Sequence, residues 1–203
     1  HRELRTAELE RLLAESRLDT LRTQLHPHFL FNALNAISAS VEQDPRTARW
    51  MLDELGTLLR SSLEHAREQE IPLHRELEFI ASYLALQKVR FDDRLEVTST
   101  VGEGLRDALV PALILQPLIE NAIRHGIALR STGGRIGMAI WREEMRLRLR
   151  VRDNGPGLPP AWDPDRDLGI GLSNTRERLR QLYGGAQSFT IRSAPEGGVE
   201  VDI

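Results

Sequence analysis

Apolar residues recur at intervals of three or four along the first half of the chain, the pattern of helices with one buried face. Asp44 followed by Pro45 is a strong helix start, because it joins a capping carboxylate to a proline at the first helical position. The preceding helix is expected to end near Ala39, and so short a connection predicts an antiparallel helical hairpin. The apolar stripe of the second helix is Leu52, Leu55, Leu59 and Leu63.

Two helices bury little between them, so the hairpin is expected to pair with a second copy as a dimeric four-helix bundle. We assign residues 1–70 to this dimerisation hairpin, with the homodimer forming through the helices of residues 1–66. A connecting helix is expected at residues 71–93. Its apolar face is Leu73, Leu77, Ile80 and Leu84.

Beyond about Arg94, glycines become frequent and apolar residues alternate with polar ones. Residues 136–140 and 145–151 both alternate, which predicts a β-hairpin with one buried face. A strand at 94–101 and a final hairpin at 188–203 complete the expected sheet.

Two helices accompany these strands. Pro111 is expected to open an apolar helix that ends near His125, and a later helix runs from about Leu172 to Tyr183. Helices packed on one face of a sheet form a layered domain, which we place at residues 94–203. The predicted fold class is therefore α+β.

The composition is that of a globular protein, since 40% of the 203 residues are hydrophobic and 28% are charged. No apolar run reaches the ~20 residues that cross a bilayer, and no segment reads as a signal peptide. We expect a cytoplasmic chain without membrane contact, or the cytoplasmic part of a sensor anchored by an upstream segment. The net charge of −3 gives no reason to expect direct nucleic-acid binding. The absence of cysteine excludes disulfides and thiolate metal ligands.

The stretch QLHPHFLFNALN, residues 24–35, places a proline between two histidines within helical sequence. At helical spacing Asn32 and Asn35 share a side with His28, while apolar residues gather opposite, so His28 is predicted to face outward. An outward imidazole is mostly neutral at pH 7 and has a ring nitrogen free for nucleophilic attack. The alternative is an ordinary surface histidine.

The stretch ENAIRHG, residues 120–126, follows in the helix after Pro111. Asn121, Arg124 and His125 are spaced to share one helical face. Mg²⁺ needs few protein oxygens because it keeps phosphate and water ligands, so Asn121 alone could anchor it. Arg124 and His125, which are cationic or hydrogen-bonding groups, would then lie near the phosphates. The alternative for Asn121 is a capping or surface amide.

Two glycine-containing stretches, DNGPGL (153–158) and GIGLSN (169–174), add to this picture. The Asp153 carboxylate can accept a hydrogen bond from an exocyclic amine, and the glycines of DNGPGL let the backbone approach a ligand closely. Glycines just before a helix favour phosphate binding through N–H groups and the helix dipole. Each stretch alone has a plain reading as a turn or a helix start, but together with Asn121 they predict a nucleotide-phosphate pocket. The glycines concerned are Gly155, Gly157, Gly169 and Gly171.

Four stretches resemble the phosphoacceptor motif and the N, G1 and G2 boxes of LytS-type sensor histidine kinases: LHPHFLFNALNAI, LILQPLIENAIRHG, DNGPGL and GIGLSNTRERLRQLYGG. The resemblance covers the chain from about Leu21. It implies that His28 is the phosphoacceptor, that Asn121 binds magnesium and that Asp153 recognises adenine. It also implies nucleotide binding by the glycines of both boxes and Leu172, and an α/β sandwich of the Bergerat type.

The implied activity is that of an ATP-dependent protein-histidine kinase of a two-component system. With ATP and Mg²⁺ it would phosphorylate its own His28 and pass the group to an aspartate of a response-regulator receiver domain. Asn32 is a candidate for orienting the phosphoryl group or a hydrolytic water. Related hydrolases carry their base four residues before the asparagine, where this chain has Pro117, so a structural or orienting role is expected for Glu120.

Two alternatives remain open from the sequence. One is a GHKL-type ATP hydrolase, against which Pro117 and the helical hairpin both argue. The other is a catalytically silent dimeric module that passes on conformational signals. Incubation with γ-labelled ATP distinguishes them, because only the kinase retains label on the protein.

Overall fold

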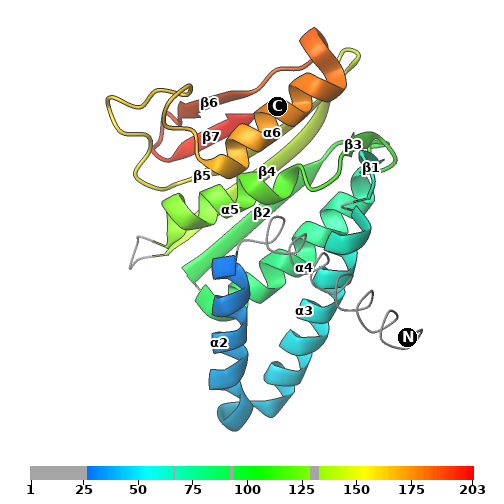
Figure 1. Cartoon of the computed structure of the whole chain (residues 1–203). Coiled ribbons are helices and arrows are strands. Elements are labelled where there is room, and N and C mark those ends of the chain that lie inside the picture. Colours follow the sequence, from blue (N-terminus) through cyan, green and yellow to red (C-terminus); the bar gives the residue numbers. More distant parts are fainter. Residues whose placement is uncertain (1–26, 66, 92–93, 129–132) are drawn as a thin grey trace, which may run out of the picture. The chain divides into compact units, whose positions relative to one another are not determined.

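The structure is a computed structural model that describes residues 27–65, 67–91, 94–128 and 133–203 (Figure 1). The chain divides into two compact units. The helical unit comprises His1–Gln69 with Ala81–Arg90, and the sheet unit comprises Glu70–Ile80 with Phe91–Ile203. Within the described residues no helix is both long enough and apolar enough to cross a membrane.

The helical unit contains an antiparallel hairpin of α2 (Pro27–Gln43) and α3 (Pro45–His65) (Figure 1). The carboxylate of Asp44 accepts hydrogen bonds from the amides of Arg46 and Thr47, both at 3.2 Å, and so caps α3. The predicted helix start at Pro45 is thereby confirmed.

The hairpin buries a different stripe of α3 from the one expected. Leu55 is 6% exposed and Leu58 is 1% exposed, whereas Leu52 remains 50% exposed. The described part of α4 (Leu73–Phe91) that belongs to this unit adds Tyr83, whose ring lies 4.7 Å from that of Phe29 between centroids. The other buried apolar residues of the hairpin are Ala33, Ile37, Ala48 and Met51.

The sheet unit is built on five strands in the spatial order β2-β4-β5-β7-β6. β2 runs parallel to β4, and the remaining pairs are antiparallel. The strands are β2 (Leu95–Val101), β4 (Gly134–Glu143), β5 (Arg146–Asp153), β6 (Thr190–Ser193) and β7 (Val199–Asp202). The hairpin of β4 and β5, and that of β6 and β7, confirm the strand predictions.

Helices α5 (Leu115–Asn121) and α6 (Ile170–Tyr183) cover one face of this sheet (Figure 1). α5 continues directly into η2 (Ala122–Ile127), a π-helix, and α6 is followed by the 3-10 turn η3 (Gly184–Ala186). The sheet residues Ile136 and Ile140 are 0% and 1% exposed. Helices layered on a sheet confirm the predicted α+β class.

The expectation that Pro111 opens a helix is wrong. Pro111 ends β3 (Leu109–Pro111), which pairs with β1 (Glu70–Pro72) in a small antiparallel sheet, and α5 begins only at Leu115. Proline has no backbone N–H to donate to a neighbouring strand, but it is tolerated in an edge strand. A turn at residues 112–114 separates the strand from the helix.

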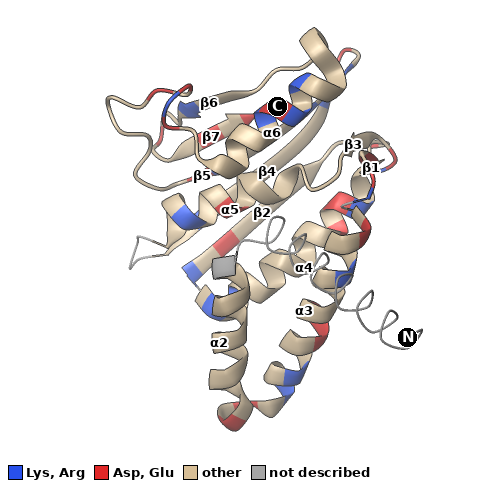
Figure 2. Ribbon diagram, in the orientation of Figure 1, with Lys and Arg blue, Asp and Glu red and all other residues tan. Residues whose placement is uncertain are grey.

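The arginines of β5 are largely paired with acidic side chains, so that opposite charges lie together on the sheet (Figure 2). Arg150 Nε lies 2.6 Å from Asp202 Oδ1, and Arg148 Nε lies 2.8 Å from Glu143 Oε2. This strand face carries a network of ion pairs.

Candidate functional site

Asp153, the last residue of β5, is 3% exposed. Its Oδ1 accepts hydrogen bonds from the amides of Gly155 at 2.7 Å and Val199 at 3.2 Å. Burial raises the pKa of Asp153, and these two bonds act against the rise. Within the described part of the chain both bonds use Oδ1, which leaves Oδ2 as an acceptor for a ligand N–H.

Glycines press the end of η2 against the turn that follows β5. A Cβ added to Gly126 would lie 2.7 Å from the Cβ of Asp153, and one added to Gly155 would lie 2.5 Å from the Cα of Gly126. Real Cβ atoms do not come so close, so the N box and the G1 box meet backbone to backbone. The Gly155 position was predicted from the sequence, whereas that of Gly126 was missed, although it directly follows the ENAIRH stretch.

A second missed glycine supports Asp153 from the other side. Gly198 has φ +90°, and a Cβ there would lie 1.9 Å from the carbonyl oxygen of Asp153. Gly157 also has a left-handed backbone, with φ +84°, and it precedes Leu158, whose amide donates to Ser193 Oγ at 3.1 Å. The pair of glycines before β7 was the signal in the sequence for the first of these.

Asn121 ends α5 at the point where the helix widens into η2. Its side chain is half-buried, makes no capping bond and has no hydrogen-bond partner among the described residues. It is therefore not the capping amide of the plain reading. π-helical bonds such as Ala128 N–H to Ile123 O at 2.8 Å are frequent at functional sites, and the wider turn brings residues four and five apart onto one face.

Arg124 and His125 lie on η2 and are both exposed. Partial burial lowers the pKa of His125, and the Arg124 guanidinium lowers it further, while Asp153 acts in the opposite direction. The imidazole is therefore neutral at pH 7 and available as a hydrogen-bonding group.

The G2 box forms the start of α6. Gly169 is the N-cap residue without a side-chain cap, and a Cβ on it would meet nothing within 4 Å, so the first turn is open. A Cβ on Gly171 would lie 3.6 Å from the Cβ of Pro117, which places this turn against α5. Leu172 is buried, at 5% exposed. An open helix start with free N–H groups favours an anion.

The three boxes of the sheet unit are thus brought together through two joints. Gly126 joins η2 to the turn after Asp153, and Pro117 joins α5 to Gly171 of α6. Glu120 faces its own helix, accepting a hydrogen bond from Gln116 Nε2 at 2.8 Å. That contact fits the structural role expected for Glu120.

The phosphoacceptor motif lies in the helical unit. The backbone of His28 belongs to α2, but its side chain, and so the predicted outward direction of the ring, lies outside the described residues. Asn32 is half-buried and Asn35 is exposed.

The donor set fits Mg²⁺ that arrives with a nucleotide. Asn121 offers one neutral oxygen with no protein partner among the described residues. The described part of the chain contains no group of three or more histidine, cysteine or acidic side chains that could hold a metal by itself. Mg²⁺ commonly takes one or two protein oxygens and completes its shell with phosphate and water.

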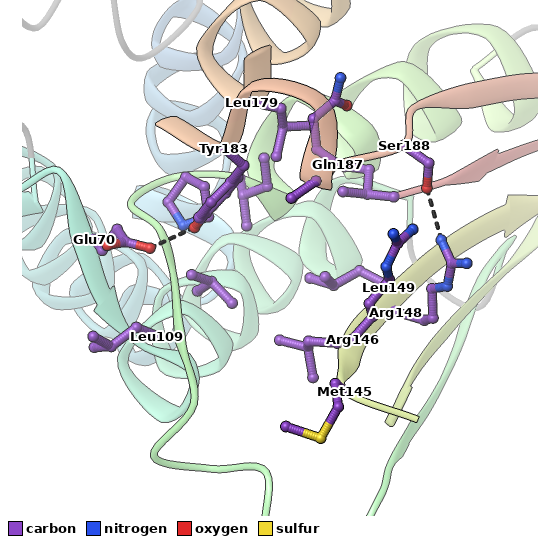
Figure 3. Close-up of a pocket in the computed structure, with 16 residues that line it drawn as sticks. Glu70, Leu109, Met145, Arg146, Arg148, Leu149, Leu179, Tyr183, Gln187 and Ser188 are labelled. Carbon is purple, nitrogen blue, oxygen red and sulfur yellow. Dashed lines mark hydrogen bonds between the residues drawn. The ribbon is translucent and has the colours of Figure 1, made fainter. Parts of the chain in front are cut away.

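A cavity of about 240 Å³ lies elsewhere in the sheet unit (Figure 3). Arg146 of β5 and Tyr183 of α6 line it, at the ends of these elements opposite to Asp153 and Gly169. Several of its polar groups partner one another: Tyr183 donates to Glu70, and Arg148 donates to Ser188 Oγ at 2.7 Å. None of the predicted site residues lines this cavity.

Comparison with known proteins identifies the families that the chain matches. Residues 16–95 match the histidine kinase family, and residues 106–203 match the histidine kinase-, DNA gyrase B-, and HSP90-like ATPases. Sensor protein LytS of Enterococcus faecalis is 33% identical over 99% of this chain and 36% of its own length. LytS of Bacillus subtilis is also 33% identical, over 99% of this chain and 36% of its own length.

Solved structures agree on the fold. The histidine kinase domain of the blue-light activated histidine kinase EL346 of Erythrobacter litoralis is 18% identical, with a TM-score of 0.53 over 97% of this chain and 95% of that chain. The catalytic domain of histidine kinase ThkA is 18% identical, with a TM-score of 0.51 over 66% of this chain and 92% of that chain.

The chain belongs to the LytS family of sensor histidine kinases and comprises a kinase core with a GHKL-type ATPase domain. The predicted resemblance is thereby confirmed, and membership of the ATPase family implies ATP binding. The chain spans 36% of the length of these LytS relatives.

Proposed function

We propose that this chain is the autophosphorylating core of a two-component sensor, which transfers the γ-phosphoryl group of ATP to His28 and then to an aspartate of a response-regulator receiver. One observation carries the proposal. The N box contacts the G1 box at the buried Asp153 through Gly126, and it contacts the open first turn of α6 in the G2 box through Pro117.

Each box has a separate task in holding ATP. Asp153 Oδ2 accepts from the adenine amine, and Gly126 and Gly155 let η2 pack closely against the turn that carries this carboxylate. The first turn of α6 at Gly169 receives phosphate oxygens through its N–H groups. Arg124 and His125 donate to the phosphates from η2.

Asn121 would hold Mg²⁺ through its amide oxygen. When bound, the ion neutralises phosphate charge, which is the main requirement of phosphoryl transfer. The partnerless, half-buried amide of Asn121 is the feature of the described residues that supports this role.

The acceptor side supplies the nucleophile. A ring nitrogen of neutral His28 attacks the γ-phosphorus with its lone pair, the bond from phosphorus to the β,γ-bridging oxygen breaks, and ADP leaves with that electron pair. The neighbour of His28 is Phe29, 5% exposed and packed on Tyr83, so this position provides anchorage for α2 and no general base. Asn32, one turn further along α2, would orient the phosphoryl group or a water.

Pairing of two helical units is supported by apolar surface. Phe31 is 67% exposed, Leu34 is 48% exposed and Leu52 is 50% exposed. Large side chains gathered on one hairpin in this way mark an interaction surface, and a second hairpin would cover them as a four-helix bundle. We place this core on the cytoplasmic side of a longer sensor, because the matched LytS relatives are nearly three times as long.

Incubation with γ-labelled ATP and Mg²⁺ tests the proposed function. We expect acid-labile, base-stable label on the wild-type chain and none on His28→Gln. The matched control is His74→Gln, since His74 lies in the sheet unit and its ring contacts the Arg106 carbonyl oxygen and Asp107 among the described residues. Release of free phosphate without bound label would instead support the ATP hydrolase, and neither product would support the silent module.

A further inference from the structure

A buried carboxylate from α4 holds the start of the N-box helix. Glu76 is 0% exposed. Its Oε2 accepts from the amide of Leu113 and its Oε1 accepts from the amide of Leu115, both at 2.8 Å. These residues lie 37 and 39 positions further along the chain, so the contact is tertiary.

The helix has no local cap that would make this contact redundant. The N-cap position of α5 is Ile114, whose side chain cannot accept a hydrogen bond. Leu113 before it has φ +59°, a left-handed backbone that is strained for a branched side chain. Something outside the turn must therefore hold it, and Glu76 takes the N–H group on each side of Ile114.

The same turn is held from α6. Arg178 donates through Nη1 to the carbonyl oxygen of Ala112 at 2.5 Å, and its charge acts on Glu76. We call Glu76, the turn of residues 112–115 and Arg178 the clasp. It joins α4, the start of α5 and the helix that begins with the G2 box.

A local serine or aspartate would cap α5 with less desolvation. Burial raises the pKa of Glu76 to about 7, although three backbone amides and Arg178 act against the rise. Burying an ionisable group opposes folding. The contacts of Glu76 offer one reason for its burial, which is that this carboxylate fixes the geometry of the turn.

We propose that Glu76 is a positioning residue that sets where Asn121 lies, by fixing the first turn of the helix that Asn121 ends. α5 has only 7 residues, and Leu115, Leu118 and Ile119 are each 0% exposed, so we expect a shift of its first turn to displace the Asn121 end as well. Glu76 belongs to the part of α4 that lies in the sheet unit, so all groups of the clasp lie within that unit. This inference rests on the proposed role of Asn121 toward the Mg²⁺–triphosphate.

The test compares ATP affinity in Mg²⁺ with ATP affinity in EDTA. In Glu76→Gln the side chain keeps its shape but retains one acceptor oxygen, so one of the two amides faces an NH₂ group. We expect affinity in Mg²⁺ to fall about tenfold, because the Asn121 end shifts. We expect less than a twofold change in EDTA, because adenine recognition by Asp153 depends on β5. Amide hydrogen exchange at residues 112–121 should accelerate.

Two further variants sharpen the comparison. Glu200→Gln is the matched control, since Glu200 is a buried carboxylate on β7, 5% exposed, that pairs with Arg192 and has no place in the clasp. It should leave the Mg²⁺-to-EDTA ratio unchanged. Arg178→Lys keeps the charge but loses the planar donor to Ala112, and it should lower the ratio in the same direction as Glu76→Gln.

The outcomes separate the two levels of the account. Wild-type binding of ATP that Mg²⁺ does not strengthen would overturn the proposed function and the positioning role with it. Normal wild-type binding with an unchanged ratio in Glu76→Gln would overturn the clasp alone. A parallel loss in Mg²⁺ and EDTA would do the same, because it would show general destabilisation.

Discussion

The buried carboxylate of Glu76 makes the stability of the sheet unit depend on pH. The perturbation is Glu76→Gln, which removes the titrating group but keeps its shape. Glu76 has a pKa of about 7 in the folded chain against an ordinary value of 4.5, because burial disfavours the charged form. Arg178 and the amides of Leu113, Ile114 and Leu115 act on this carboxyl group, and all of them favour its ionisation.

The sign follows from where the proton is held. Below pH 4.5 Glu76 is protonated in both states and contributes no pH dependence. Between pH 4.5 and about 7 the unfolded chain has lost the proton while the folded chain keeps it, so stability falls as pH rises. Above pH 7 the loss is complete. The difference of roughly 2.5 pKa units corresponds to about 3 kcal/mol.

Native-state hydrogen exchange measures this dependence within the sheet unit. The free energy of opening is determined for amides of β4 and β5 in the wild type and in Glu76→Gln from pH 4.5 to 8, with correction for intrinsic exchange at each pH. We expect the variant to gain about 3 kcal/mol relative to the wild type as pH rises through this range. A constant difference, or a gain toward low pH, would refute the reasoning.

Three further predictions address the site and the dimer. Gly126→Ala should destabilise the sheet unit by ~1–3 kcal/mol in thermal unfolding and weaken ATP binding, because its Cβ would lie 2.7 Å from Asp153. The control Gly185→Ala should leave thermal unfolding unchanged, because a Cβ at that position meets nothing within 4 Å. Asp153→Asn should weaken ATP about tenfold or more in calorimetry, since an amide oriented to accept from the Gly155 amide presents NH₂ to adenine; unchanged affinity would exclude adenine recognition by Asp153. Phe31→Glu together with Leu34→Glu should convert a dimer to a monomer in light scattering, and a persistent dimer would show that these exposed side chains are not the interface.

Local chemistry in the sequence was a reliable guide where the structure depends on neighbouring residues. The capped start at Asp44 and Pro45 is confirmed because both signals act within one turn. The β4–β5 hairpin is confirmed because alternation reflects one buried face. Asp153 and Gly155 could be picked out as a site because the stretch DNGPGL combines an acceptor with glycines.

Features that depend on distant residues could not be predicted in this way. Pro111 resembled a helix start because the sequence does not reveal its partner strand β1. The sequence also gives no sign that the distant Glu76 caps α5. The importance of Gly126 and Gly198 comes from the close approach of segments remote in sequence. The buried stripe of α3 differs from the predicted one because the sequence does not distinguish leucines that pack within the hairpin from leucines that stay on its surface.

The most direct test of the central claim is to locate the phosphoryl group on the intact chain after incubation with ATP and Mg²⁺. Fragmentation mass spectrometry at neutral pH, which preserves phosphohistidine, can assign it to one residue. The account predicts a single modified position, His28, and its loss in Asn121→Ala and Asp153→Asn. Phosphate on another residue, or modification of His28 that survives both substitutions, would contradict the account.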